Sequence, residues 1–508
     1  MRLGITLGAT AIALAAVAPA ADAFCGFYIN GSDQKMFNDA TQVVLMRQGT
    51  RTVLSMQNDF RGPLSDFAMV VPVPVVLKEA DVKTLDKGVF DRIDALGSPR
   101  LVEYWEQDPC MPRYDAERDT IGRASKPTAT PRSSDAKQDG VKIEASFSVG
   151  EYKILILSAT DSSGLGRWLA GNGYKIPPGA EPYLRPYVES GSKFFVAKVD
   201  PKKVKMVGNR AALSPLRFHY DSDEFALPIR LGMANADGKQ DLIVNILADK
   251  RYEVANYKNV VIPTNFDVKN DVRTRFGEFY AALFDKTVEA NPGAVVTEYA
   301  WTTNPSFKCD PCPPQVPADA DAMTLGGDVV GGRLGQGYYV LTRLHARYGK
   351  GDMKDDLRFK EAKAITGGRE TWSKQGLEYG AQPSSENYFQ ARYAIRHWWT
   401  GAINCPNPNR GVWGGPPDGR YQAPIAASKV AFAPRGKLEL ASVIKRDLWE
   451  INYKRTPTPT PGSRGAPTPG PNGFAKPPGG NKAMGFGLGV LGGALGIFLG
   501  RLTARRRK

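Results

Sequence analysis

An uncharged apolar run, Ala483–Gly500, lies close to the C-terminus. As a helix, its 18 residues would span about 27 Å, close to the hydrocarbon thickness of about 30 Å. The basic residues that follow in 501–508 are of the kind that stays on the cytoplasmic side. Residues 454–482 are rich in Pro, Thr and Gly, which is typical of a disordered linker. We therefore predict one transmembrane helix over 483–500, a basic cytoplasmic tail over 501–508, and a folded body that ends at residue 453.

The N-terminus has the features of a secretory signal peptide over residues 1–23. Arg2 precedes the apolar stretch Leu3–Val17, and Ala21-Asp22-Ala23 supplies the small residues that cleavage needs. The predicted body therefore lies outside the inner membrane, in the periplasm or at the cell surface. Its C-terminus is cytoplasmic unless the tail is processed. The end of the chain resembles the tripartite sorting tails of bacterial surface proteins. It lacks their Cys or Pro-Glu-Pro motif, which favours permanent anchoring.

Glycines recur at helical spacing inside the predicted membrane helix. Gly485, Gly489 and Gly493 are four residues apart, and Gly496 lies on a second such row. Small residues at this spacing let two helices approach closely. We predict a homo-oligomer formed through this helix, and a plain anchor is the alternative.

The charge of the chain is concentrated at its end. The net charge is +15, but residues 454–508 hold ten basic residues and no acidic one. The body carries only a small positive charge, which argues against a nucleic-acid partner. Hydrophobic residues make up 42% and charged residues 23%, enough to build a large core.

All five cysteines lie in the predicted exported body, where disulfides form. They are Cys25, Cys110, Cys309, Cys312 and Cys405. We predict a bridge between Cys25 and Cys110, and a loop closed by Cys309 and Cys312. A thiol-redox site at Cys309 is the alternative, but Pro313 and Pro314 oppose the helix that such a site needs. A zinc half-site completed by Cys405 and His397 is a third reading. We predict neither a metal site nor a cofactor.

The hydrophobic patterns predict an α+β fold, mainly antiparallel strands with singly inserted helices. Thr41–Met46 and Arg51–Met56 form a hairpin, and the wide apolar stripe of Arg275–Ala290 predicts a helix. A short helix is predicted over Pro99–Glu106, and an amphipathic helix over Leu438–Trp449. We divide the body into a β-rich domain at 24–265 and a second α+β region at 266–453.

Two segments place basic residues on alternate positions of predicted strands. Arg343, His345 and Arg347 alternate in Tyr338–Tyr348, and Arg392 and Arg396 alternate in Tyr388–Trp398. If the two strands pair, they form one basic face beside Trp398 and Trp399. Arginine and aromatic side chains suit anionic or sugar ligands. The alternative is a solvated sheet face without a ligand.

Several short segments together resemble DUF2330, an uncharacterised family of exported or membrane-anchored bacterial proteins. The segments are Phe24–Tyr28, Met69–Pro74, Ser98–Glu106 leading to Cys110, Gly150–Tyr152, Leu157–Ala159, Trp168-Leu169, Asn172–Tyr174, Ser214–Phe218 and Leu227–Leu231. The resemblance covers most of the chain from Phe24 to about Tyr348. It implies an envelope protein, and it transfers no catalytic residue.

The body contains no familiar catalytic signature. It has no His-Glu-x-x-His, no Gly-x-Ser-x-Gly and no complete phosphate-binding loop. We therefore expect a binding or scaffolding ectodomain rather than an enzyme. The alternatives are an exported hydrolase whose site assembles only in three dimensions, and a redox protein using Cys309 and Cys312. A deep polar pocket around His219 or His345 would favour the hydrolase.

Overall fold

The computed structural model describes most of the body. The described residues are 27–29, 37–61, 68–111, 136–138, 141–174, 176, 179–207, 210–235, 239–349, 351–368, 370–371, 376–377, 380–420, 422–427 and 438–454. They belong to a single compact unit, Met1–Thr456. Cys25, the predicted signal peptide, the predicted linker beyond residue 454, the predicted membrane helix and the predicted basic tail lie outside these residues. Among the described residues, no helix is long and apolar enough to cross a membrane.

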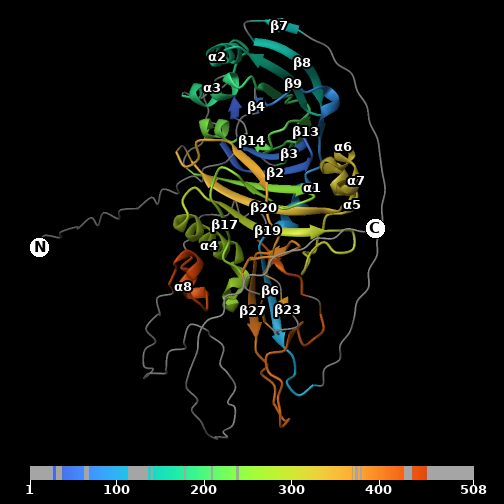
Figure 1. Ribbon diagram of the computed structural model, residues 1–508, viewed down its shortest axis with the longest axis vertical. Helices are drawn as coiled ribbons and strands as arrows, with labels where there is room; N and C mark the ends of the chain where they lie inside the picture. The colour runs from blue at the N-terminus through green and yellow to red at the C-terminus, as the bar shows by residue number, and fades with distance from the viewer. Residues whose placement is uncertain are drawn as a thin grey trace, which may run out of the picture. The chain divides into compact units, whose positions relative to one another are not determined.

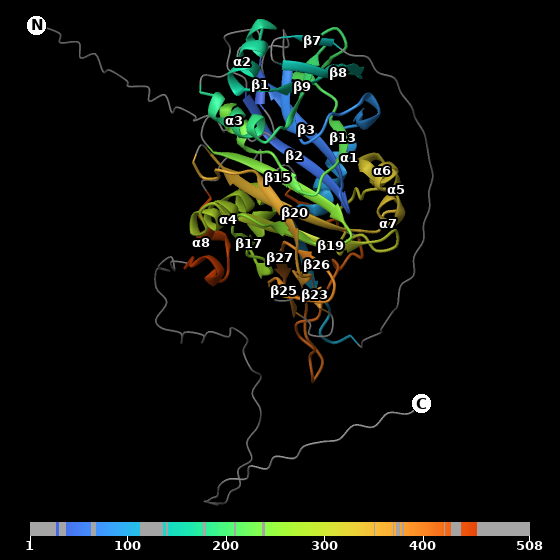
Figure 2. The same cartoon turned by 45° about the horizontal axis from the view of Figure 1, so that its top comes forward.

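An eleven-stranded sheet runs through the middle of this unit (Figures 1 and 2). It takes strands from both sides of residue 265. Its order is β25 (Gln382–Pro383), β22 (Ile365–Gly367), β26 (Tyr388–Gln390), β19 (Val295–Thr303), β20 (Tyr339–Tyr348), β15 (Gln240–Ala248), β2 (Phe37–Gln48), β3 (Arg51–Arg61), β13 (Leu216–Asp221) and β5 (Val82–Thr84), with β17 (Asn259–Val261) beside β19. The β2–β3 pair is the predicted hairpin, with Gly49 at φ 57° in its turn.

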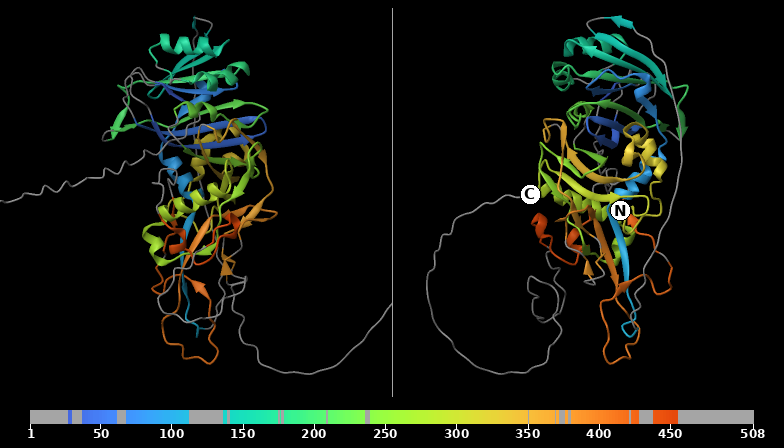
Figure 3. Two further views of the ribbon diagram at one scale, coloured as in Figure 1. Left: turned by 90° about the vertical axis from the view of Figure 1, so that its left-hand side faces the viewer. Right: turned by 45° about the vertical axis from the view of Figure 1, so that its right-hand side comes forward.

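A six-stranded antiparallel sheet packs on one face of the central sheet. Its order is β1 (Phe27–Ile29), β4 (Ala68–Val73), β10 (Lys193–Val199), β9 (Tyr152–Ala159), β8 (Val141–Val149) and β7 (Ala136–Gln138). Alternate residues such as Ile154 and Phe195 join Val43 and Leu45 in the core between the two sheets. The opposite face is covered by α2 (Ser162–Gly171) and α3 (Glu181–Glu189). Figure 3 shows the same succession of layers from two sides.

Two helices cover the other face of the central sheet. Val89, Phe90, Ile93 and Leu96 of α1 (Gly88–Gly97) pack against Val44, Trp301 and Leu341. The predicted helix Arg275–Ala290 is confirmed as α4 (Phe276–Ala290). Its aromatic stripe packs both on Val296 and Ala300 of the central sheet and on Tyr393 and Ile395 of another sheet.

That second contact is with a five-stranded sheet formed by chain segments far apart in sequence. Its order is β18 (Phe266–Asp267), β27 (Arg392–His397), β6 (Arg100–Glu106) and β28 (Trp413–Gly414), with β29 (Ile425–Ala426) also beside β6. The β27 and β6 strands are parallel and lie side by side in Figure 1. The predicted helix over Pro99–Glu106 is therefore wrong, because hydrogen bonding to β27 holds these residues extended.

The remaining elements are short. They are the sheet of β14 (Ala226–Leu227), β21 (Leu357–Glu361) and β16 (Tyr252–Val254), the pairs β11 (Lys205–Val207) with β12 (Arg210–Ala212) and β23 (Glu370–Thr371) with β24 (Gly376–Leu377), the helices α5 (Asp319–Ala322), α6 (Asp328–Val330), α7 (Gly332–Gly335) and α8 (Leu440–Val443), the 3-10 turns η1 (Glu79–Asp81), η2 (Arg230–Asn235), η3 (Asn270–Thr274) and η7 (Trp449–Ile451), and the π turn η4 (Met323–Gly327). The predicted helix Leu438–Trp449 is thus reduced to one turn, because Ile444 leaves the helix to bridge Val268. The fold is mixed α and β, with strands outnumbering helices.

Candidate functional site

One face of the five-stranded sheet carries arginines and tryptophans in continuous contact. The register places Arg392 opposite Arg100, and Arg396 opposite Tyr104. Cross-strand partners point to the same side of a sheet, and alternate residues share a face. We call this surface the Arg–Trp face. It consists of Arg100, Tyr104, Glu106, Arg392, Arg396, Trp398, Arg410 and Trp413.

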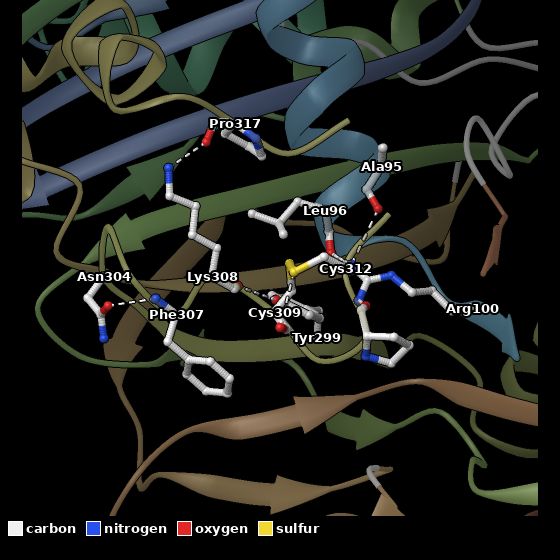
Figure 4. Close-up of a disulfide and its surroundings, with 11 residues drawn as sticks. Ala95, Leu96, Arg100, Tyr299, Asn304, Phe307, Lys308, Cys309, Cys312 and Pro317 are labelled. Carbon is white, nitrogen blue, oxygen red and sulfur yellow. Dashed lines mark hydrogen bonds between the residues drawn. A yellow bond between two sulfur atoms is a disulfide. The ribbon is translucent and has the colours of Figure 1, made fainter. Parts of the chain in front are cut away.

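Arg100 forms the buried end of the Arg–Trp face. Its Nη2 donates to the carbonyl of Leu96 in the last turn of α1 (Figure 4). Its Nη1 donates to Pro311 O at 2.7 Å. The carbonyl end of a helix carries partial negative charge, which stabilises a nearby cation. Burial nevertheless lowers the pKa of Arg100 to about 10.

Trp398 forms the opposite, exposed end. Its side chain is 58% exposed, and its ring packs edge-on against buried Trp413, with 4.8 Å between ring centroids. The Arg410 guanidinium lies 5.8 Å from the Trp398 ring centroid, and Arg396 lies 4.7 Å from that of Trp413. These contacts hold an exposed aromatic ring in a fixed position.

Glu106 ties the loop that carries these residues back to β6. Its carboxylate accepts from Arg410 Nε at 2.7 Å and Nη2 at 2.8 Å, and from the backbone N–H groups of Gly411 and Trp399. Burial acts to raise the pKa of Glu106, but Arg410 and these N–H groups hold it below the usual value. Glu106 therefore stays ionised and keeps the loop in place.

A disulfide closes the same end of the sheet. Cys110 pairs with Cys405, with 5.5 Å between the Cα atoms. The predicted Cys25–Cys110 bridge is therefore wrong, because Cys110 has a partner 295 residues downstream. Met111, which follows Cys110, is 71% exposed, and Ile403 is also exposed. We call residues 106–111 and 396–420 the tip.

The other predicted basic row is buried and neutralised. Arg343 and His345 on β20 have no exposed surface, and Arg347 is almost as enclosed. The β20 strand pairs with β15 and β19, whereas β27 pairs with β6 and β18. The two rows therefore do not form the single basic face predicted from the sequence. Alternation shows that residues share a face, but it does not show whether that face meets solvent.

Glu298 is the central acceptor of this buried row. It is the extra residue of a β-bulge between Thr297 and Tyr299 of β19. Its carboxylate accepts from Arg343 Nε at 2.6 Å and Tyr280 OH at 2.7 Å, and lies 2.7 Å from His345 Nδ1. Burial acts to raise the pKa of Glu298, but His345 and Arg343 lower it to about 2.

The ion pairs continue on both sides of Glu298. Arg343 Nη1 also donates to Asp94 of α1 at 2.7 Å, and His345 Nε2 lies 3.2 Å from Asp241. Burial acts to lower the pKa of His345, yet Glu298 and Asp241 raise it above the usual value. Arg347 pairs with Asp241 and Asp285. Each charged group is therefore engaged by an opposite charge inside the fold.

The Cys309–Cys312 pair forms the second disulfide, with 5.0 Å between Cα atoms. Cys309 is buried beside α1, and no helix begins at it. The loop also supplies Pro311 O to Arg100 and is fixed by Lys308 Nζ, which donates to Pro317 O at 2.8 Å (Figure 4). The geometry is that of a loop closed by a disulfide and packed on the core.

Two other features among the described residues bear on the alternatives. No group of three or more His, Cys, Asp or Glu side chains there is arranged to hold a metal ion. A cavity of about 200 Å³ lies beside α3 and β14, lined in part by Tyr187, Arg230 and Asp356. Its lining includes neither His219 nor His345. Asp356 Oδ1 already accepts from Tyr187 OH at 2.6 Å and from two backbone N–H groups.

Sequence reasoning placed Arg392, Arg396 and Trp398 together and missed the rest of the tip. Residues 396–420 contain three tryptophans and three arginines, no Lys, no Glu and one Asp. This composition is the sequence signal that could have predicted an interface, because protein interfaces are enriched in aromatic residues, Met and Arg and depleted in Lys, Glu and Asp.

Comparison with known proteins gives one family. A family model described as "Uncharacterized protein conserved in bacteria (DUF2330)" matches residues 19–360. The match includes β6 and ends before β27. No curated protein and no solved structure gives a significant match.

Proposed function

We propose that this chain, which belongs to the uncharacterised bacterial family DUF2330, is a non-catalytic binding protein anchored in the cell envelope, and that it engages a protein partner through its tip. The single observation that carries this proposal is the exposure of Trp398, a large aromatic ring held rigidly by Trp413 and Arg410. Tryptophan and arginine dominate the energetic centres of protein interfaces. Holding the ring in place before binding reduces the entropy lost on association.

The sequence supports the anchored topology. In this proposal, an exported, mainly antiparallel α+β body is joined by a Pro/Thr/Gly-rich linker to a membrane helix at 483–500. Gly485, Gly489, Gly493 and Gly496 provide the surface on which two such helices associate. The full-length protein is expected to stay in the membrane fraction after an alkaline wash. Release of the protein by this wash would contradict the predicted membrane helix.

The buried charges support a binding role over acid–base catalysis. A catalytic acid or base must reach the proton that it transfers. Glu298 and His345 have no exposed surface, and each is bonded to opposite charges. Their arrangement serves the packing of β19, β20 and α4.

A site-specific photocross-linker tests the tip directly. The amino acid p-benzoylphenylalanine is placed at position 398 in the full-length protein in intact cells. The matched control carries it at Arg420, whose side chain is 88% exposed on the same loop. We expect a discrete cross-link to one protein from position 398 and none from position 420. The partner is then identified by mass spectrometry and tested with purified proteins.

Two outcomes would overturn the proposal. The same pattern from both positions would mean that Trp398 has no special role. A cross-link only to a second copy of this chain would assign the tip to self-association instead of partner binding.

A further inference from the structure

Two buried guanidinium groups lie next to each other on the Arg–Trp face. Arg100 and Arg392 are partners in the register of β6 and β27. Arg100 is fully enclosed, and Arg392 is 2% exposed. Both groups have lost their hydration, and their like charges repel. A buried charge is stable only when it is paired and hydrogen-bonded.

Protein groups satisfy these two arginines only in part. Arg392 Nη1 donates to Tyr104 OH at 2.7 Å, but its Nε and Nη2 have no hydrogen-bond partner. Arg100 has carbonyl partners through Nη1 and Nη2, while its Nε has none. Three buried nitrogens, Nε and Nη2 of Arg392 and Nε of Arg100, therefore carry N–H groups without a hydrogen-bond acceptor.

Asn265 adds a further open donor beside Arg392. Its backbone N–H donates to Arg392 O at 2.8 Å, and its φ of 66° is unusual for a residue other than glycine. Both polar atoms of its side chain are buried without a partner. Asn tolerates this left-handed backbone, so the observation that points to a ligand is the buried amide without a partner.

The neighbouring carboxylates are committed elsewhere. On the same face, Glu106 is held by Arg410, and Asp267 lies 3.1 Å from Arg396 Nε. Asp310 acts on the charge of Arg100 but is exposed, so solvent screens it. Among the described residues, no carboxylate forms an ion pair with Arg100 or Arg392.

We propose that Arg392, Arg100 and Asn265 bind a small free oxyanion, a phosphate or a carboxylate. An oxyanion offers several acceptor lone pairs to the open N–H groups and neutralises the two cations. The enclosure of Arg392 favours a small ion over a charged group on a polymer. This site is separate from Trp398, so it does not depend on partner binding.

The first test measures phosphate and acetate binding to the full-length protein in detergent. Tm is followed as sodium phosphate or sodium acetate replaces sodium chloride at constant ionic strength, so that general screening is unchanged. A ligand that binds only the folded state raises Tm in proportion to the logarithm of its concentration. We expect a rise of several degrees with one of the two anions, and equilibrium dialysis of labelled phosphate gives its stoichiometry independently.

The Arg392→Met variant separates an anion site from a structural arginine. Without anion, this variant is expected to have a Tm equal to or above that of the wild type, because it removes an unpaired buried charge. Its response to phosphate or acetate is expected to be lost. The matched control is Arg251→Met, which removes a similarly buried arginine that is paired with Glu253 and Lys363 O. That control should lower Tm and keep the anion response.

Three results would overturn the site. The first is a wild-type Tm that rises no more in phosphate or acetate than in chloride. The second is an Arg392→Met variant whose Tm still rises with the anion as much as that of the wild type. The third is dialysis that shows no bound anion, which would mean that water alone fills the site. If Arg392→Met does not fold, Tyr104→Phe provides a milder test. It removes the hydroxyl that orients Arg392 and should weaken anion binding without abolishing it.

Discussion

Replacing Glu298 with Gln would show how much of the stability depends on the buried ion pairs. The change preserves the size of the side chain and removes its charge. It leaves Arg343 and His345 without their shared carboxylate, in a place with no access to water. In the wild type, Arg343 Nε and Tyr280 OH donate to Glu298, and the His345 ring contacts it. In the variant, the amide NH₂ of Gln faces one of these groups in place of a carboxylate oxygen.

The magnitude follows from this geometry. Removing one partner of a buried ion pair costs about 3–5 kcal/mol. Asp94 still pairs with Arg343 and Asp241 still pairs with His345, so the lower end of this range is expected. The matched control is Glu278→Gln, which makes the same chemical change at an exposed pair with Arg275, with 2.8 Å between Nη2 and Oε2. An exposed pair contributes about 0–1 kcal/mol. The two variants should therefore differ by at least about 2 kcal/mol, or roughly 30-fold in the unfolding equilibrium.

Urea unfolding followed by tryptophan fluorescence measures both variants. The midpoint is expected to fall strongly for Glu298→Gln and little for Glu278→Gln, with unchanged slopes. Equal midpoints for the two variants would refute the reasoning. They would mean that the buried charges are compensated by groups other than Glu298.

Three further predictions follow from the same structure. Because the pKa of Glu298 is about 2 in the folded chain against an ordinary 4.5, its contribution is complete above pH 4.5 and is lost as the pH falls toward 2; Glu298→Gln should flatten the stability profile in that window, measured by urea unfolding at a series of pH values. Removing the Cys110–Cys405 disulfide should lower the free energy of unfolding by about 3–4 kcal/mol more than removing Cys309–Cys312, because it closes a loop of about 295 residues instead of a single turn. Urea unfolding of the two cysteine-to-serine variants measures both losses, and equal losses would contradict this prediction. Trp413→Ala should destabilise by about 3–5 kcal/mol because the ring is buried, whereas Trp398→Ala should change stability by less than about 1 kcal/mol; a large Tm loss in Trp398→Ala would assign that ring to the fold rather than to binding.

Local signals in the sequence predicted the elements that depend on local contacts. The β2–β3 hairpin turns at Gly49, and α4 displays a continuous aromatic stripe, so both were found without knowledge of their partners. The strand β6 was mistaken for a helix because its partner, β27, lies almost 300 residues away. No window of sequence around Pro99 contains that information.

The candidate site shows the same limit. Alternation grouped Arg392 with Arg396 and Arg343 with His345, and the sequence prediction joined both rows into one basic face, whereas the two strands lie in different sheets. It could not reveal that Glu298 enters a bulge and neutralises the second row. Whether a basic row is neutralised depends on carboxylates from other elements, so the same spacing produced arginines packed on Tyr104 and Trp413 in one case and a closed ion-pair core in the other.

The distance along the chain between Cys110 and Cys405 has a consequence for how the protein matures. At synthesis rates of about 5–20 residues per second, Cys405, which lies 295 positions after Cys110, is made about 15–60 s later. If the chain is exported while it is still being synthesised, Cys110 enters an oxidising compartment after Cys25 and before its own partner, Cys405, has been made. An early bond between those two would have to be undone before the tip could close. Correct assembly would then depend on a catalyst of thiol–disulfide exchange in that compartment. The fraction of chains that contain the Cys110–Cys405 bond would depend on the amount of that catalyst.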